Sequence, residues 1–422
     1  MNRPGQSLLS RLNFARPEER SSKQYRFSAE ALLKLLSQLR SGHLQIILPN
    51  NERKEFGNPA DTLHAEIQIT DWSVFKQVMS HGDIGFAESY IRGQWNTPDL
   101  KSLLELAIRN RTILEKAIYG NWYGSIFYRL KHWLRDNTKS GSRKNIQAHY
   151  DLGNAFYTLW LDPTMSYSSA WFSKSGHQTL AEAQRAKIER ILGSIGAKAS
   201  DHILEIGCGW GGLAAYAAKH YNVEVLGITI SQEQQHLSQA RCAGLPVQIE
   251  LMDYRDLSGQ FDKIVSVGMF EHVGDRNYRT YFKHAYQLLK DEGLFLLHSI
   301  GSNITTRATD PWINRYIFPN GKIPSPIEIT KNIDRLFLIE DWHNFGQDYD
   351  KTLMAWHDNF EKAWPALSTN YDQKFYRMWK YYLLSSAGYF RSRQGQLWQI
   401  VLSKRNKGST YRSSRMKTFG HH

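Results

Sequence analysis

Cysteine is almost absent from this 422-residue chain, which contains only Cys208 and Cys242. Neither stands at a spacing typical of a metal site, so we expect a reduced, cytosolic protein without a metal. Long apolar runs are absent as well, because no segment approaches the roughly 18 consecutive apolar residues of a membrane-spanning helix. The N-terminal residues are basic and lack the continuous apolar stretch of a secretory signal. No internal repeat is present, which argues against a repeat architecture.

Acidic residues are outnumbered. The chain has 53 Lys and Arg against 40 Asp and Glu, which gives a formal net charge of +13. A surface of this sign attracts polyanions, so nucleic acid and anionic lipid are both candidate partners from composition alone. The length is sufficient for a large core and for more than one domain.

Apolar segments alternate with helical patterns from about residue 145 onward. Seven of these segments read as strands: Ile203–Gly207, Glu224–Ile228, Gln248–Met252, Lys263–Val267, Leu294–His298, Phe337–Trp342 and Leu397–Ser403. Helical patterns separate the first five. This alternation predicts a doubly wound α/β domain with a mostly parallel, seven-stranded sheet covered on both faces.

The rest of the chain is expected to flank this domain. The predicted segments are a disordered basic tail (1–24), a small N-terminal α+β domain (25–120), a basic amphipathic linker (121–145), the α/β domain (146–403) and a basic C-terminal tail (404–422). Leucine spacing predicts a helix at Ser28–Arg40, and alternating residues predict strands at Leu44–Leu48 and His64–Ile69.

The linker combines aromatic and basic residues at helical spacing. Its apolar positions include Trp122, Ile126, Leu130 and Trp133, and its cations include Arg129, Lys131 and Arg135. Such a helix either packs between two domains or lies in a membrane interface with its cations on lipid phosphates. The pattern itself favours neither interpretation.

The most informative segment reads LEIGCGWGG and runs from Leu204 to Gly212. It is a strand, a tight glycine turn and a helix start, which is where doubly wound folds bind nucleotide-like ligands. The turn glycines allow the backbone to approach a ligand closely. Glu205 stands on the strand just before a short GxG, and an acid there suits a ligand that bears an amino acid better than a pyrophosphate. The segment therefore indicates S-adenosylmethionine and a methyltransferase.

Later strand ends carry residues that can face the same ligand. Thr229 and Gln234 follow the second strand, where many folds of this type grip a ribose, and Tyr254 follows the third, where a ring can flank an adenine. Glu271 follows the fourth strand and His298 ends the fifth. Because the carboxyl ends of such strands converge on one crevice, we expect Glu271 and His298 at the reactive end of the ligand.

Several long segments, in order, resemble one enzyme family. They include HYDLGNAFY (149–157), LDPTMSYSSAWF (161–172), SVGMFEHVG (266–274) and DPWINRYIFPNGKIPS (310–325). Over about residues 60 to 403 the chain is similar to cyclopropane-fatty-acyl-phospholipid synthases, which are related to the mycolic-acid cyclopropane synthases. The resemblance implies an S-adenosylmethionine-dependent enzyme. It would methylate the cis double bond of an unsaturated phospholipid acyl chain, and loss of a proton would then close a cyclopropane ring.

The resemblance also implies a site with two halves. The cofactor half would use Tyr167, Ser168, Gly207, Gly209, Thr229, Ile230, Gln234 and Tyr254. The catalytic half holds a bicarbonate ion in this family, and its contacts match the side chains of Glu271, His298 and Tyr349 and the backbone amides of Ser169 and Ile300. No metal is implied.

Two positions depart from the family pattern. Ser169 and Ser386 stand where the family commonly has cysteine. A serine at 169 keeps the backbone amide. Ser386 is counted with the catalytic candidates for its place in the family pattern, but it argues against an obligatory thiol there, and its helical surroundings favour a packing role. Together they raise a second interpretation, a related lipid methyltransferase that makes a methyl-branched chain. A nucleic-acid methyltransferase and a non-catalytic membrane-associated protein are further alternatives, and the lipid-enzyme motifs and the intact Glu271, His298 and Tyr349 argue against them.

The expected partner is therefore anionic membrane phospholipid, both as substrate and as docking surface, and not nucleic acid. We expect a cytoplasmic enzyme that is peripheral at the inner membrane surface. A homodimer is one oligomeric state that the sequence allows.

Overall fold

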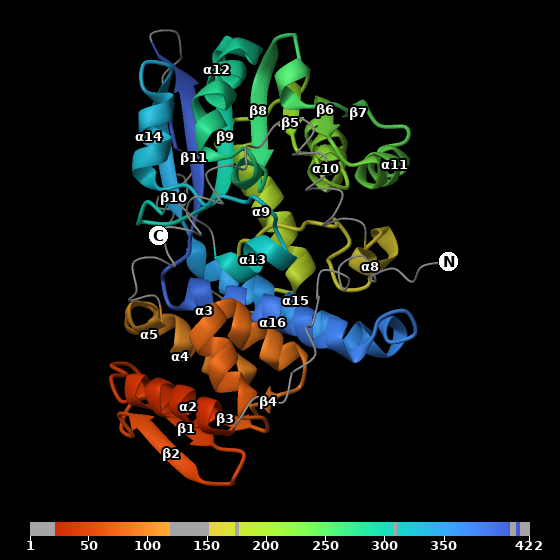
Figure 1. Ribbon diagram of the computed structural model, residues 1–422. Coiled ribbons are helices and arrows are strands. Elements are labelled where there is room, and N and C mark those ends of the chain that lie inside the picture. The colour runs from red at the N-terminus through yellow and green to blue at the C-terminus, as the bar shows by residue number, and fades with distance from the viewer. Residues whose placement is uncertain (1–21, 119–151, 174–176, 307–309, 406–410, 414–422) are drawn as a thin grey trace. The chain divides into compact units, whose positions relative to one another are not determined.

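The computed structural model describes residues 22–118, 152–173, 177–306, 310–405 and 411–413 (Figure 1). The chain forms two compact units. Unit 1 comprises Met1–Arg135, Asp310–Pro319 and Glu361–Arg393, and unit 2 comprises Asp136–Thr309, Asn320–Phe360 and Gln394–His422. The predicted linker at 121–145 lies outside the described residues, as do most of the two predicted basic tails.

Unit 1 contains a small mixed sheet with the strand order β2-β1-β3-β4. The strands are β1 (His43–Ile47), β2 (Arg53–Gly57), β3 (His64–Ile69) and β4 (Trp95–Asn96). The early helices are α2 (Ser22–Leu36), α3 (Ser73–Ile91), α4 (Leu100–Arg109) and α5 (Arg111–Ile118). The predicted helix and both predicted strands are present, and the helix begins six residues earlier than its leucine pattern suggests. Strands β2 and β4 are additional.

Two later segments also belong to unit 1. They are α13 (Pro311–Tyr316) and α16 (Gln373–Arg391). On α16, the Arg377 guanidinium donates to the carbonyls of Tyr90 (2.6 Å) and Trp95 (2.9 Å). Gly388 approaches α4 so closely that a Cβ on it would lie 3.4 Å from the backbone of Glu105. The compact units therefore differ from the contiguous segments that the sequence predicts.

Unit 2 is built on a seven-stranded sheet with the order β10-β11-β9-β8-β5-β6-β7. Its strands are β5 (His202–Ile206), β6 (Glu224–Thr229), β7 (Val247–Leu251), β8 (Phe261–Val267), β9 (Leu289–Gly301), β10 (Phe337–Asn344) and β11 (Gln396–Lys404). Strands β5 to β9 run parallel to one another, and β11 is antiparallel to both of its neighbours, β9 and β10. All seven predicted strands are present, and the predicted fold class is confirmed.

Helices cover both faces of this sheet (Figure 1). Helices α12 (Tyr278–Leu288) and α14 (Pro326–Ile333) pack on one face with Leu204, Ile264 and Phe295 of the strands. Helices α9 (Leu180–Ser194) and α10 (Gly212–Tyr221) pack on the other with Ile203 and Val265. The alternation of strand side chains between two apolar layers is what a sheet buried on both faces requires.

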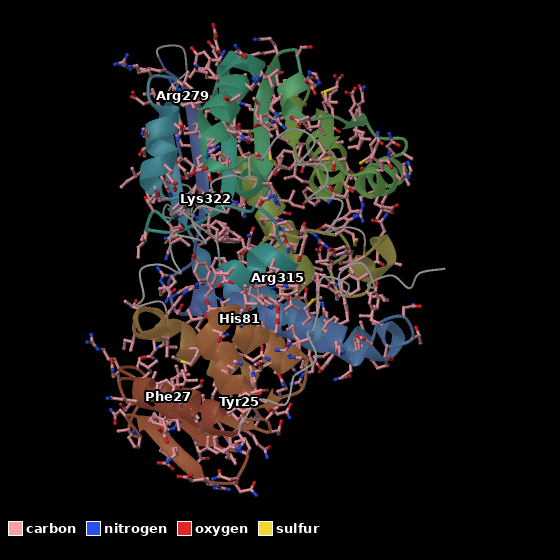
Figure 2. The ribbon with its side chains drawn as sticks, viewed as in Figure 1. Tyr25, Phe27, His81, Arg279, Arg315 and Lys322 are labelled. Atoms are coloured by element: carbon pink, nitrogen blue, oxygen red, sulfur yellow. The ribbon has the colours of Figure 1, made fainter. Side chains whose placement is uncertain are left out.

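Helix α14 is held at both ends by contacts of Arg279 and Lys322, two residues that Figure 2 labels. Arg279 donates to the carbonyl of Asn332 (2.7 Å) at the C-terminal end, where helix carbonyls lack internal partners. Lys322 lies before the other end, with its Nζ 3.2 Å from Glu328 Oε1. The backbone N–H of Lys322 donates to the carbonyl of Glu271 (2.8 Å). The anchored helix thus fixes the loop that carries Glu271.

Candidate active site

The glycine turn after β5 has the conformation that its sequence predicts. Gly207 and Gly209 have φ values of 82° and 55°, in the left-handed region that side chains disfavour. The N–H groups of Gly207 and Cys208 both donate to the carbonyl of Ile228 (3.0 Å each), so the turn is tied to β6. A Cβ on Gly209 would meet no protein atom within 4 Å, which shows that this position faces open space.

That open space is a crevice at the carboxyl ends of β5, β6 and β8. It encloses about 1200 Å³ between atoms, its open mouth included. All eight residues predicted for the cofactor half line it: Tyr167, Ser168, Gly207, Gly209, Thr229, Ile230, Gln234 and Tyr254. The structure therefore brings together segments that are almost 90 residues apart in the chain.

The polar residues of the crevice are held by one another. The Thr229 hydroxyl donates to Gln234 Oε1 (2.8 Å), which fixes the orientation of the Gln234 amide. Asp253 forms an ion pair with Arg255 (2.7 Å), and Tyr254 lies between them in the chain. These contacts orient the residues predicted for the ribose and adenine side before any ligand enters.

Sequence reasoning missed Lys187 and used Glu205 only to identify the ligand class. Both line the crevice and are buried. Burial raises the pKa of Glu205 to about 8 and lowers the pKa of Lys187 to about 8, because each charge loses its hydration. The Lys187 ammonium donates to the Ser168 hydroxyl (2.9 Å). The sequence feature that could have revealed Lys187 is its place among the apolar positions of α9, one residue before Ile188.

The Glu271 carboxylate accepts a hydrogen bond from strand β9 beyond the point where β8 stops pairing with it. Strand β8 ends at Val267, which pairs with His298 of β9. Beyond that point, Glu271 Oε1 accepts the backbone N–H of Ile300 (2.7 Å). Its other oxygen, Oε2, is buried and has no hydrogen-bond partner among the residues that the structure describes. Burial raises the pKa of Glu271 to about 7.

His298 lies two residues before Ile300, so their side chains are on one face of β9. The ring is buried, and burial lowers the pKa of His298 to about 3, which keeps the ring neutral. Its Nδ1 lies 3.3 Å from Gln399 Nε2, and no hydrogen-bond partner of its Nε2 occurs in the described part of the chain. The structure thus brings Glu271, His298 and Ile300 together, although the Ile300 amide donates to Glu271 itself.

Tyr349 lies on α15 (Gly346–Leu367), and Ser169 contacts the same helix. The Ser169 hydroxyl lies 3.4 Å from Thr352 Oγ1, one helical turn after Tyr349. The half-buried Tyr349 ring contacts Trp356 (6.0 Å between centroids), and Trp356 also contacts Tyr167 of the crevice (5.3 Å). Trp356 therefore joins the predicted catalytic half to the predicted cofactor half.

Ser386 is the exception among the predicted catalytic residues. It lies on α16, which belongs to unit 1, whereas the other five belong to unit 2. Its role stays a prediction. No group of three or more His, Cys, Asp or Glu suited to a metal occurs among the described residues, and none of their helices has the length and apolarity to cross a membrane.

The doubly wound sheet, the glycine turn after β5 and the crevice at the strand ends define a class, the α/β methyltransferases. Residues 137–400 match the family of mycolic acid cyclopropane synthetases. The chain belongs to this family and is an S-adenosylmethionine-dependent methyltransferase.

Individual relatives agree with this assignment. The chain is 46% identical over 352 residues to the cyclopropane-fatty-acyl-phospholipid synthase of Escherichia coli strain K12, covering 81% of this chain and 88% of that one. It is 36% identical to the tuberculostearic acid methyltransferase of Mycobacterium tuberculosis, covering 78% and 80%. The crystal structure of a mycolic acid cyclopropane synthase complexed with SAH and CTAB has 30% identity and a TM-score of 0.59, and it covers 62% of this chain and 98% of that one.

Proposed function

We propose that the enzyme transfers a methyl group from S-adenosylmethionine to the cis double bond of unsaturated phospholipid acyl chains and closes a cyclopropane ring. One observation carries the proposal. Among the described residues, Glu271 Oε2 and His298 Nε2 are buried and have no hydrogen-bond partner. Neither residue lines the crevice, but Glu271 precedes its lining residue His272 and His298 pairs with its lining residue Val267. The E. coli relative, named for this activity, supports the choice of substrate.

The crevice residues fit S-adenosylmethionine, which supplies an electrophilic methyl group when it is bound. Glu205 Oε2 is buried and has no hydrogen-bond partner among the described residues, and a bound cation would favour the ionised form of this carboxyl. The hydrogen bond between Thr229 and Gln234 and the position of Tyr254 on the crevice lining support the proposed ribose and adenine contacts. The solved relative that carries SAH supports this assignment.

The second group of residues fits bicarbonate, which would supply a base for the proton lost on ring closure. Glu271 and His298 would hold the ion through Oε2 and Nε2, which have no hydrogen-bond partner among the described residues. At its raised pKa of about 7, Glu271 exchanges a proton near neutral pH, so it can accept from a hydroxyl or donate. Tyr349 and the Ser169 amide are the further proposed contacts.

Exclusion of water is the other requirement, because water would quench the cation that methyl transfer leaves on the acyl chain. The rings of Tyr157, Trp160, Tyr167 and Trp356 contact one another beside the crevice. Trp160 and Trp356 are fully buried. We infer that this cluster shields the reacting atoms, and aromatic faces can also stabilise a cation.

Lipid analysis after expression in a host without such an enzyme tests the function. The expected result is a mass gain of one CH2 group per double bond, with loss of the olefinic proton signals and appearance of the upfield cyclopropane methylene signals. Unchanged lipids in the presence of folded enzyme would refute the proposal.

A methyl-branched product is the second candidate. Ser169 and Ser386 depart from the family pattern, and the tuberculostearic acid methyltransferase is a relative at 36% identity. The same lipid sample decides between the two, because a branched chain gives a methyl or methylene signal and no cyclopropane signal.

We also propose that the enzyme docks on anionic membranes. Its net charge of +13 supports this, since each Lys or Arg near such a surface contributes about 1 kcal/mol. The predicted docking helix at 121–145 remains a proposal, because it lies outside the described residues.

A further inference from the structure

A polar chain leads from His298 across two neighbouring strands to helix α9, which covers the same face of the sheet. Gln399, on β11, pairs directly with His298 on β9. Its Nε2 lies 3.3 Å from His298 Nδ1, and its Oε1 accepts from the Nε of Arg190 (3.1 Å) on α9. His298 and Gln399 are both buried, with exposed fractions of 1% and 3%. The three residues come from three different elements of unit 2.

The direction of every hydrogen bond in this chain follows from Arg190. A guanidinium has donors only and does not lose its proton in proteins, so the Gln399 atom that it contacts must be the carbonyl oxygen. The opposite end of the same amide is then the NH2 group, which can only donate. His298 Nδ1 must therefore accept and cannot carry a proton.

Arg190 is itself fixed by other partners. Its Nη2 lies 2.8 Å from His343 Nδ1, which must accept for the same reason. The guanidinium also lies over the ring of Trp171, 5.4 Å from its centroid. These contacts hold the guanidinium independently of Gln399, so Arg190 can act as the fixed end of the chain.

We propose that Arg190 and Gln399 are positioning residues that hold His298 in the tautomer with its proton on Nε2. This inference rests on the proposed function, because it assigns a use to the ring atom that has no partner. In this tautomer, Nε2 presents an N–H donor to an anionic oxygen. The opposite tautomer would present a lone pair there and would repel the same oxygen.

Nitrogen NMR of protein labelled with ¹⁵N-histidine reads the tautomer directly, because protonated and bare ring nitrogens have well-separated shifts. The His298 signals are assigned by their loss in His298→Gln. We expect a proton on Nε2 and a bare Nδ1 in the wild type, measured with bound S-adenosylhomocysteine.

Gln399→Glu is the critical variant. Its carboxylate still accepts from Arg190, yet it offers no donor to His298, so the proton should appear on Nδ1. We expect kcat to fall about 100-fold, as for loss of one preorganised donor, while the KM for S-adenosylmethionine is unchanged. Arg190→Met should give a mixture of tautomers and a smaller fall. Arg185→Met, an exposed arginine on the same helix, is the matched control and should match the wild type in both measurements.

A proton on Nδ1 in the wild type would overturn the inference, and so would Gln399→Glu with wild-type shifts and wild-type kcat. Melting temperature and S-adenosylhomocysteine affinity show whether each variant is folded. If Gln399→Glu does not fold, the tautomer is decided by the spectra of the wild type and of Arg190→Met. Failure of the proposed function is distinguishable, because it would appear as missing cyclopropane lipid while the tautomer is as expected.

Discussion

The buried ammonium of Lys187 donates to the hydroxyl of Ser168 at 2.9 Å and so ties helix α9 to the segment that borders the crevice. Gln184, one turn earlier on α9, donates to the Ser168 carbonyl at 2.8 Å. Two adjacent side chains of one helix therefore hold both the backbone and the side chain of a single crevice residue. Helix α9 thus fixes the position of Ser168 in the wall of the crevice, and one of the two contacts is made by the protein's own buried ammonium group.

Replacing Lys187 with Met should weaken binding of S-adenosylhomocysteine about 10-fold. The loss corresponds to one hydrogen bond to a charged group, about 1.5 kcal/mol. Calorimetric titration measures it, and Lys283→Met, an exposed lysine on α12, is the control. Equal affinities in the two variants would show that Ser168 needs no such anchor.

Replacing Gly209 with Val should abolish cofactor binding and leave the fold intact. The added side chain has room at its Cβ but projects into the crevice, and the positive φ adds roughly 1–2 kcal/mol of strain. Gly193→Ala, at a helical glycine with open space, is the control. A folded Gly209→Val protein with wild-type affinity for S-adenosylhomocysteine would rule out this site.

Replacing Glu271 with Ala should reduce turnover by ~10²–10³ without weakening cofactor binding, because one preorganised polar partner is lost. Wild-type activity should fall in carbonate-depleted buffer and return when bicarbonate is added. Full activity without carbonate would exclude the ion and leave Glu271 itself as the base.

The pH dependence of stability should distinguish Glu271→Gln from the wild type. The pKa of Glu271 rises on folding from 4.5 to about 7, so the unfolded chain loses its proton first as pH rises. As pH rises from 4.5 to about 7, the free energy of unfolding of the wild type should therefore fall by about 3 kcal/mol relative to that of the variant. Above this range the difference should stay constant. Urea unfolding of both proteins across this range measures the difference, and a constant difference would contradict the raised pKa.

The membrane proposal is tested by reversing three charges of the predicted linker. Replacing Arg129, Lys131 and Arg135 with Glu should strongly reduce sedimentation with anionic vesicles, while thermal stability stays nearly unchanged. Wild-type binding should also weaken as salt rises. A triple variant that sediments like the wild type would show that another surface, first the tail from Lys404, carries the docking.

Local patterns were sufficient to predict the large sheet, because each of its strands is an apolar run flanked by helical or turn signals. Strand β2 was missed because its residues, RKEFG, have no buried face and owe their conformation to pairing with β1. The grouping of α16 with unit 1 depends on contacts such as Arg377 with Tyr90, 287 residues apart. No local pattern carries that information.

The candidate site divides in the same way. The glycine turn and the strand ends were predictable, because the carboxyl ends of parallel strands in such a sheet meet at one crevice. The residues that orient them were not. Arg190 and Gln399 are 209 residues apart, and each is an ordinary polar residue in its own segment.

Strand β11 is the last of the seven strands along the chain, yet it lies inside the sheet, between β9 and β10, and all nine of its residues are buried. It also brings Gln399 to His298. During synthesis on the ribosome, the preceding strands can pair before this one emerges, but His298 acquires its partner only when residues 396–404 have left the exit tunnel. A nascent or prematurely terminated chain therefore carries the glycine turn of the crevice but lacks the Gln399 contact that we propose positions His298.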